Sequence, residues 1–132
     1  KILSNINLKG FTVFYSQDGM DEISIFSPTY FYFQNGKKIT KKKVSNKIYE
    51  KYLNKKPNFN EIKGKDPKYN ANRLIQLFQG KKDSYRDIVV INSIYGMKTI
   101  KPNMNFNNCY DLINSTLDNG IALKHLQKLQ RQ

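Results

Sequence analysis

The first third of the chain alternates short uncharged apolar runs with polar turns, which is the pattern of β-strands. Residues 11–15 read Phe-Thr-Val-Phe-Tyr, and residues 23–33 form a second extended run. Runs of β-branched and aromatic residues bounded by turn signals predict strands. A third run covers residues 37–43, and Asn35-Gly36 before it is a strong signal for a two-residue hairpin turn. We therefore expect a strand followed by a hairpin.

The third run is lysine-rich, with lysine at positions 37, 38, 41, 42 and 43. Lysines on an outer strand block edge-to-edge pairing, so this run predicts a solvated sheet edge. The facing arm contains four consecutive aromatic residues, 30–33. Such residues can stack on nucleic-acid bases, but packing of an antiparallel hairpin is the interpretation we favour.

The rest of the chain has helical spacing after a charged, irregular stretch. Residues 44–63 predict a surface connection with one short helix over 47–53, its inward residues being Ile48, Tyr52 and Leu53. Asp66-Pro67 is a typical helix start, with Asp66 as N-cap and Pro67 in the first turn, and Gly80 is a typical stop.

Three further helices are expected, over about 84–98, over 105–117 and after Gly120. In the first, Ile88 to Ile91 favour a strand by propensity, but the family resemblance described below implies a buried helix, and the length of the segment agrees with it. Asn92 would then be an internal polar residue that needs hydrogen-bond partners, with contact to a substrate as the alternative. Cys109 lies on an apolar helical face and predicts a buried structural thiol, whereas His125 predicts an exposed, inert residue.

The most distinctive stretch is the acidic segment, residues 18–24, which reads Asp-Gly-Met-Asp-Glu-Ile-Ser. It follows the first predicted strand, and open α/β sheets bind ligands at strand ends. Adjacent carboxylates repel each other, and a hard cation such as Mg²⁺ relieves that repulsion while keeping water or phosphate as its other ligands. The alternative is an Asp-Gly turn followed by a solvated acidic pair.

Four blocks resemble anthranilate phosphoribosyltransferases, in the same order and at similar spacing. Residues 18–24 and 27–29 resemble that family's Asp-Gly-x-Asp-Glu-Ile-Ser and Gly-Pro-Thr, with serine in place of the glycine. Residues 64–71 resemble its Gly-Gly-Asp-x-x-x-Asn-Ala, with Lys65 replacing the second glycine. The last two blocks, 86–92 and 118–123, resemble its Arg-Asp-x-x-x-x-Asn and Asp-Ser-Gly-x-Ala-Leu.

This resemblance implies the transfer of a phosphoribosyl group from phosphoribosyl diphosphate to anthranilate, in tryptophan biosynthesis. Residue by residue, it assigns Mg²⁺ binding to Asp21 and Glu22, and we assign Asp18 and Gly19 to the shape of the turn. The family's diphosphate-binding Gly-Thr-Gly-Gly-Asp loop and its anthranilate-binding residues have no counterpart here. We therefore expect a truncated or split enzyme, inactive alone, whose catalytic and substrate-binding residues lie elsewhere.

The expected fold class is α/β: the C-terminal part of a mixed-sheet α/β domain, with a β-hairpin followed by a cluster of helices. Residues 1–43 would hold the strands and hairpin, 44–63 the linker and 64–132 the helices. A homodimer, or a partner chain that supplies the N-terminal part, completes the expected enzyme. One cysteine and the family indicate a cytoplasmic protein, and no apolar run is long enough for a membrane span.

Charge introduces the remaining alternatives. The formal net charge is +13, which invites a nucleic-acid-binding relative without enzyme activity. However, the 23 basic residues are 20 lysines and only 3 arginines, and arginine is preferred for phosphate and base contacts. The abundance of Lys, Asn and Ile is also what drift in an AT-rich genome produces, so nucleic acid is the minor alternative, beside a decayed remnant.

Overall fold

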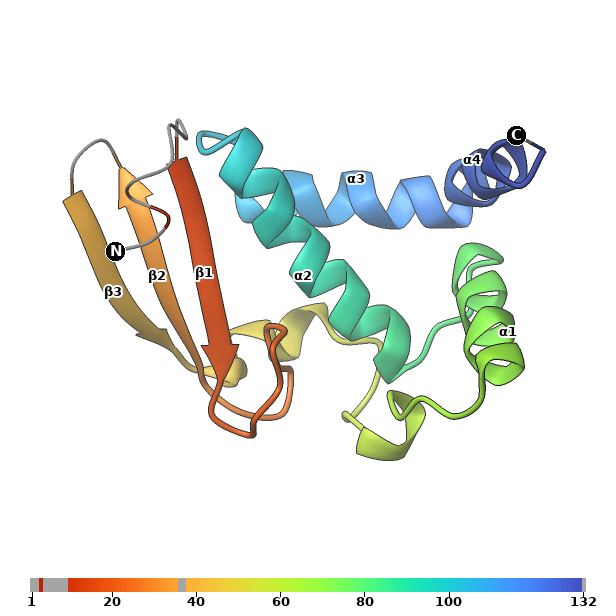
Figure 1. The fold of residues 1–132 in the computed structure, drawn as a ribbon, viewed down its shortest axis with the longest axis horizontal. Coiled ribbons are helices and arrows are strands. Elements are labelled where there is room, and N and C mark those ends of the chain that lie inside the picture. Colours follow the sequence, from red (N-terminus) through yellow and green to blue (C-terminus); the bar gives the residue numbers. More distant parts are fainter. Residues whose placement is uncertain (1–2, 4–9, 36–37, 132) are drawn as a thin grey trace.

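The computed structural model describes residues 3, 10–35 and 38–131, and it has an α/β arrangement (Figure 1). Its sheet has three antiparallel strands in the order β1-β2-β3, namely β1 (Gly10–Ser16), β2 (Thr29–Asn35) and β3 (Lys38–Val44). Val13 faces Tyr32, which in turn faces Lys41. This pairing confirms the predicted hairpin. Gly36 of its Asn-Gly turn lies outside the described residues.

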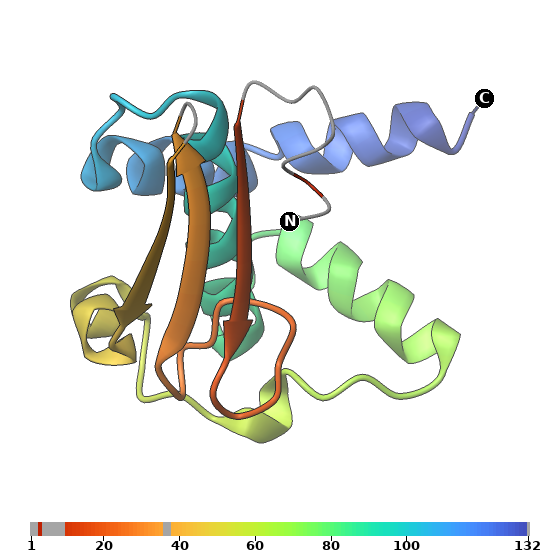
Figure 2. The ribbon, with the colours of Figure 1, turned by 60° about the vertical axis from the view of Figure 1, so that its left-hand side comes forward.

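Two short 3₁₀ helices and four α-helices follow the sheet. The 3₁₀ helices are η2 (Asn46–Tyr52) and η3 (Phe59–Glu61). The α-helices are α1 (Pro67–Phe78), α2 (Ser84–Ile100), α3 (Phe106–Asp118) and α4 (Ile121–Leu129). Helix α2 lies against the sheet, behind the three strands in Figure 2. Helices α1 and α4 lie on the side of α2 away from the sheet (Figure 1).

The helix boundaries follow local sequence signals. The Asp66 side chain accepts a hydrogen bond from the Tyr69 N–H at 2.8 Å, with Pro67 in the first turn, as predicted. After α1, Gly80 takes a φ of +88°, which lets the chain leave the helix in the left-handed region. Residues 88–91 are helical despite their β propensity, because α2 buries Ile88, Val90 and Ile91 in the core.

The core lies between the inner face of the sheet and α2. Phe31 of β2 stacks on Tyr95 of α2 with ring centroids 4.8 Å apart. The Tyr49 and Tyr95 hydroxyls form a hydrogen bond of 2.8 Å, which satisfies both groups inside the protein. Cys109 is fully buried and His125 is exposed, as the sequence predicted.

The outer face of the sheet carries Tyr15, Tyr30 and Tyr32, whose rings stack on one another. Lys41 and Lys43 of β3 lie over the Tyr30 ring at 5.4 and 5.3 Å. Among the described strands β3 is an outer one with exposed lysines, so the predicted solvated edge is confirmed. β1, the other outer strand, contains no charged residue.

Two expectations about local structure are wrong. The run 23–33 is not one strand, because residues 23–28 form bends and the strand begins at Thr29. Ile48 is 50% exposed, whereas its neighbour Tyr49 is 1% exposed. The expected α-helical period places Ile48 with Tyr52, but the observed 3₁₀ helix has three residues per turn and therefore aligns Tyr49 with Tyr52.

None of the helices within the described residues is long and apolar enough to cross a membrane.

Candidate functional site

The acidic segment leaves the carboxyl end of β1 in a tight turn, at the end of the molecule where α2 begins (Figure 1). Gly19 has a φ of +89°, a conformation that glycine adopts at no steric cost. Asp18 accepts hydrogen bonds from the Met20 N–H at 3.3 Å and from the Ser24 hydroxyl at 2.6 Å. The prediction that Asp18 and Gly19 shape the turn is therefore confirmed.

A network of hydroxyl groups closes the loop between β1 and β2. The Ser16 hydroxyl donates to the Glu22 carbonyl at 2.6 Å and lies 2.7 Å from the Thr29 hydroxyl. The Ser24 N–H donates to both hydroxyls, at 2.9 Å to Ser16 and 3.2 Å to Thr29. Ser16, Ser24 and Thr29 are buried, so these hydrogen bonds hold the two ends of the loop together away from water.

Asn92 of α2 fixes the loop from the other side. Its Oδ1 accepts from the Ile23 N–H at 2.9 Å, and its Nδ2 donates to the Ile23 carbonyl at 2.9 Å. The same Nδ2 donates to the Ile88 carbonyl, one turn earlier in α2, also at 2.9 Å. The prediction that Asn92 is an internal polar residue with partners is confirmed, and its principal partner is the residue that follows Glu22.

The Asp21 and Glu22 side chains are exposed on this braced loop. Neither carboxylate forms a hydrogen bond or an ion pair with any residue that the structure describes. Several other acidic residues have clear partners, for example Asp83 with Arg73 and Glu61 with Lys55, whereas Glu50 and Asp111 are single exposed carboxylates. In a chain of net charge +13, two adjacent carboxylates without a basic partner are therefore available to a cation from solution.

A cavity of about 360 Å³ opens beside Glu22, between the acidic segment and the first half of α2. Most of its lining is apolar, and Glu22 and Asn92 are its polar members. The lining residues are Met20, Glu22, Ile62, Tyr85, Ile88, Val89 and Asn92. The acidic segment thus borders a space that a ligand can enter from solvent.

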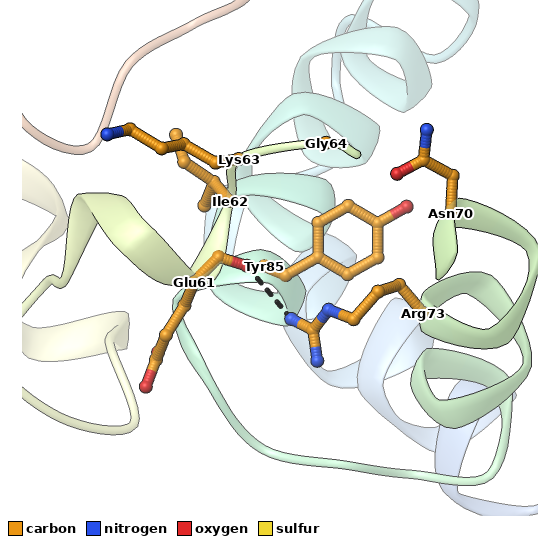
Figure 3. A pocket seen from close by; sticks show the side chains of 7 residues that line it. All are labelled: Glu61, Ile62, Lys63, Gly64, Asn70, Arg73 and Tyr85. Atoms are coloured by element: carbon orange, nitrogen blue, oxygen red, sulfur yellow. Dashed lines mark hydrogen bonds between the residues drawn. The ribbon is translucent and has the colours of Figure 1, made fainter. Parts of the chain in front are cut away.

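A second cavity, of about 190 Å³, shares Ile62 and Tyr85 with the first and is lined by Arg73 (Figure 3). The guanidinium of Arg73 lies over the Tyr85 ring at 5.0 Å and donates to the Glu61 carbonyl at 2.9 Å. It also donates to the Asp83 carboxylate at 2.9 Å. The charge of Arg73 is therefore already paired. Its contacts join α1 to η3 and to the start of α2.

The block 64–71 also has a structural role. Asn70 accepts a hydrogen bond from the Lys65 N–H at 2.9 Å and donates to the Lys65 carbonyl at 3.1 Å. No non-glycine residue in the described part of the chain has a positive φ, so Lys65 replaces the family's glycine without backbone strain. The prediction that this block starts a helix is confirmed.

The last two blocks meet in space as an ion pair between a buried arginine and an exposed aspartate. Arg86 is 1% exposed, and its Nη1 lies 2.7 Å from Asp118 Oδ1 without hydrogen-bond alignment, so this contact is electrostatic. The Nε and Nη2 of Arg86 donate to Asn114 Oδ1. Arg86 therefore has an ion-pairing role, and its partner comes from the end of α3.

Asp87 holds the segment after η2. Its carboxylate accepts from the Asn54 N–H and side-chain amide. Burial raises the pKa of Asp87 above its ordinary value, although the Asn54 hydrogen bonds act in the opposite direction. Of the four blocks, only 18–24 therefore presents unpaired carboxylates.

Sequence reasoning missed three parts of the site: Ser16, Thr29 and the apolar lining from α2. Ser16 and Thr29 are short polar residues at strand ends, and no local pattern distinguishes them from ordinary turn residues. Within the described residues, no group of three or more His, Cys, Asp and Glu side chains could hold a metal ion. The acidic segment therefore offers the two carboxylates of Asp21 and Glu22 to a cation.

Comparison with known proteins gives relatives named anthranilate phosphoribosyltransferase. The relative from Clostridium beijerinckii is 36% identical over 93 residues, which is 70% of this chain and 26% of the relative. The relatives from Pelagibacter ubique and Petrotoga mobilis are 27% and 26% identical over 97% and 98% of this chain. The chain spans 38% and 37% of the length of those two relatives.

A family model described as the a/b domain of a glycosyl transferase family matches residues 1–123. That match covers nearly the whole chain, and it includes all four blocks on which the resemblance rests. The chain therefore belongs to this glycosyl transferase family.

Proposed function

We propose that the chain is part of an anthranilate phosphoribosyltransferase and that Asp21 and Glu22 are its Mg²⁺-binding residues. The observation that carries the proposal is the pair of unpartnered carboxylates on a braced loop at the end of β1. The name of the relatives indicates the reaction, in which the amino group of anthranilate takes the phosphoribosyl group of phosphoribosyl diphosphate and diphosphate leaves.

The residues present fit a magnesium ion. Mg²⁺ is commonly bound through one or two carboxylates and keeps water or substrate phosphate as its remaining ligands. Asp21 and Glu22 are exposed carboxylates without a competing cation, which matches that requirement. When bound, the ion neutralises the negative charge that develops on the departing diphosphate.

The protein's own contribution at this corner is orientation. Ser16 and Asn92 hold the backbone at residues 22 and 23, so the backbone beside the carboxylates needs little reordering when a cation binds. The cavity beside Glu22 is mainly apolar, and a low-dielectric wall strengthens electrostatic interactions at its rim.

We also propose that the loop for the diphosphate and the groups for anthranilate come from polypeptide outside these 132 residues. The chain spans between 26% and 38% of the relatives' length. The intact mass of the native product in its source organism separates two cases. A larger mass means a longer chain. A mass of 15.5 kDa means that activity requires a second chain with the loop, and failure to find that chain would favour a decayed remnant or a binding role.

Manganese binding tests the metal site directly. Mn²⁺ broadens the NMR signals of nearby amides, so a titration should broaden residues 20–24 before other regions. Asp21→Asn and Glu22→Gln should each remove that broadening. Glu50→Gln is the matched control, because Glu50 is also exposed and forms no hydrogen bond or ion pair with the described residues. Equal broadening in all four proteins would contradict the proposed site.

A further inference from the structure

Asn92 connects the middle of α2 to the acidic segment across 69 positions of sequence. Both polar atoms of its side chain are used there, one on the Ile23 N–H and one on the Ile23 carbonyl. A side chain that satisfies both backbone groups of one residue fixes the orientation of that peptide segment in the way a paired strand would. Ile23 is fully buried, and Asn92 is half-buried beside the cavity.

The neighbouring residue is held from the opposite side. The Glu22 carbonyl accepts the Ser16 hydroxyl at 2.6 Å, so the backbone of residues 22 and 23 is tied both to β1 and to α2. The Asp21 and Glu22 side chains have no bonds of their own to the described residues. Their direction therefore depends on the backbone that Ser16 and Asn92 hold.

We propose that Asn92 is a positioning residue for the carboxylates of Asp21 and Glu22, acting through the backbone of Ile23. This inference rests on the proposed metal site. Its physical basis is preorganisation, because a cation that finds its ligands already oriented does not lose affinity to ordering them. Asn92 also lines the cavity that Glu22 borders, so the same side chain links the metal corner to the wall of that cavity.

The competing explanation is that Asn92 only stabilises the fold. Asn114 of α3 provides a matched control for that possibility. Its Nδ2 donates to the Tyr110 carbonyl four residues earlier at 3.0 Å, as Asn92 does to Ile88 at 2.9 Å. Its Oδ1 accepts from a distant residue, Arg86, and no hydrogen bond joins it to the acidic segment. Both side chains are half-buried.

The experiment compares Mn²⁺ binding to the wild-type chain, Asn92→Ala, Asn114→Ala and Asp21→Asn, with folding checked by circular dichroism. Loss of a residue that orients metal ligands typically lowers metal affinity by about 10- to 100-fold. We expect a loss of about tenfold for Asn92→Ala, and a change of less than about twofold for Asn114→Ala. Equal affinity in wild type and Asn92→Ala, or equal losses in the two asparagine variants, would overturn the proposal. Insensitivity to Asp21→Asn would instead refute the proposed metal site.

A measurement without metal keeps the two failures apart. Hydrogen exchange of the Ile23 amide should be slow in the wild type and faster in Asn92→Ala, with increased mobility at residues 20–23. Asn92→Asp retains the acceptor for the Ile23 N–H and loses the donor, so it should be intermediate and serves if the alanine variant does not fold. An Ile23 amide that exchanges as fast as that of Asp21 in the wild type would overturn the proposal whatever the metal does.

Discussion

Replacing Asp118 by alanine should destabilise the chain by removing the partner of a buried guanidinium. Arg86 is 1% exposed, and Asp118 Oδ1 lies 2.7 Å from its Nη1. Arginine stays protonated in proteins, so the positive charge remains buried when the carboxylate is lost. Asn114 still accepts from the Nε and Nη2 groups, which leaves Nη1 as the atom without a partner.

The size of the effect follows from two terms. Loss of the carboxylate leaves a buried, charged donor without its partner, which costs about 1.5–3 kcal/mol, and the larger penalty for breaking a fully buried pair does not apply because Asp118 is 44% exposed. Asp118 is also the last residue of α3, where the helix dipole disfavours a carboxylate by roughly 0.3–1 kcal/mol. The net loss attributable to the ion pair is therefore about 1–2.5 kcal/mol.

Urea unfolding followed by circular dichroism measures this loss, and Asp111→Ala is the control. Asp111 lies in the same helix, is exposed, and forms no hydrogen bond or ion pair with the described residues. Both variants lose one negative charge and gain the helix propensity of alanine, so the difference between them reports the contact with Arg86 less the helix-dipole term at Asp118, which is the net loss given above. A difference below about 0.5 kcal/mol, the range of ordinary surface substitutions, would refute the reasoning.

Three more predictions concern single residues. The hydrogen bond from Lys55, and after it the one from the Ser84 N–H, lowers the pKa of Glu61 to about 2. The contribution of ionised Glu61 to the free energy of unfolding is therefore complete above pH 4.5 and is lost as the pH falls towards 2. Because this contact is partly exposed, Glu61→Gln should remove roughly 1 kcal/mol of that acid dependence in urea midpoints measured from pH 7 to 2.5, and an unchanged dependence would contradict it. Cys109 should react with a thiol reagent only at the rate of unfolding, and rapid labelling of the native protein would show that it is accessible. Gly19→Ala should destabilise the protein by about 1–2 kcal/mol because the φ of Gly19 is +89°. Gly96→Ala should stabilise it by about 0.5–1 kcal/mol, because Gly96 lies in α2 and its added Cβ has no atom within 4 Å. Melting temperatures of the two variants that shift in the same direction would refute this backbone argument.

Signals that act within a few residues were readable from the sequence. Asp66, Pro67 and Gly80 predicted the start and the end of α1 because capping depends on neighbouring backbone groups. The strand before the acidic segment and the pairing of the hairpin were readable for the same reason. The helical state of residues 88–91 was different, because propensity alone favours a strand there and the helix was implied by the family resemblance, with which the length of the segment agreed.

Features that depend on tertiary contacts were not readable. The sequence does not distinguish a 3₁₀ helix from an α-helix at η2, which have three and 3.6 residues per turn. The type of helix decides whether Ile48 or Tyr49 is buried. The need of Asn92 for partners was evident, but its partner lies 69 positions away. Likewise, the sequence placed Asp21 and Glu22 on a turn without showing that Ser16 and Asn92 hold the backbone beneath them.

The contrast between the two outer strands gives the sheet a preferred direction of growth. The Gln17 N–H donates to the Pro28 carbonyl and so points towards β2. Backbone groups of successive residues point in alternate directions in an antiparallel sheet, so the N–H and C=O groups of Thr12 and Phe14 point away from β2. No described strand lies on that side, and β1 has no charge to repel one. Beside β3, any added strand meets a row of ammonium groups. Of the two outer strands, β1 is therefore the one whose edge can accept a further strand, whether from another polypeptide or from a second copy of the isolated chain.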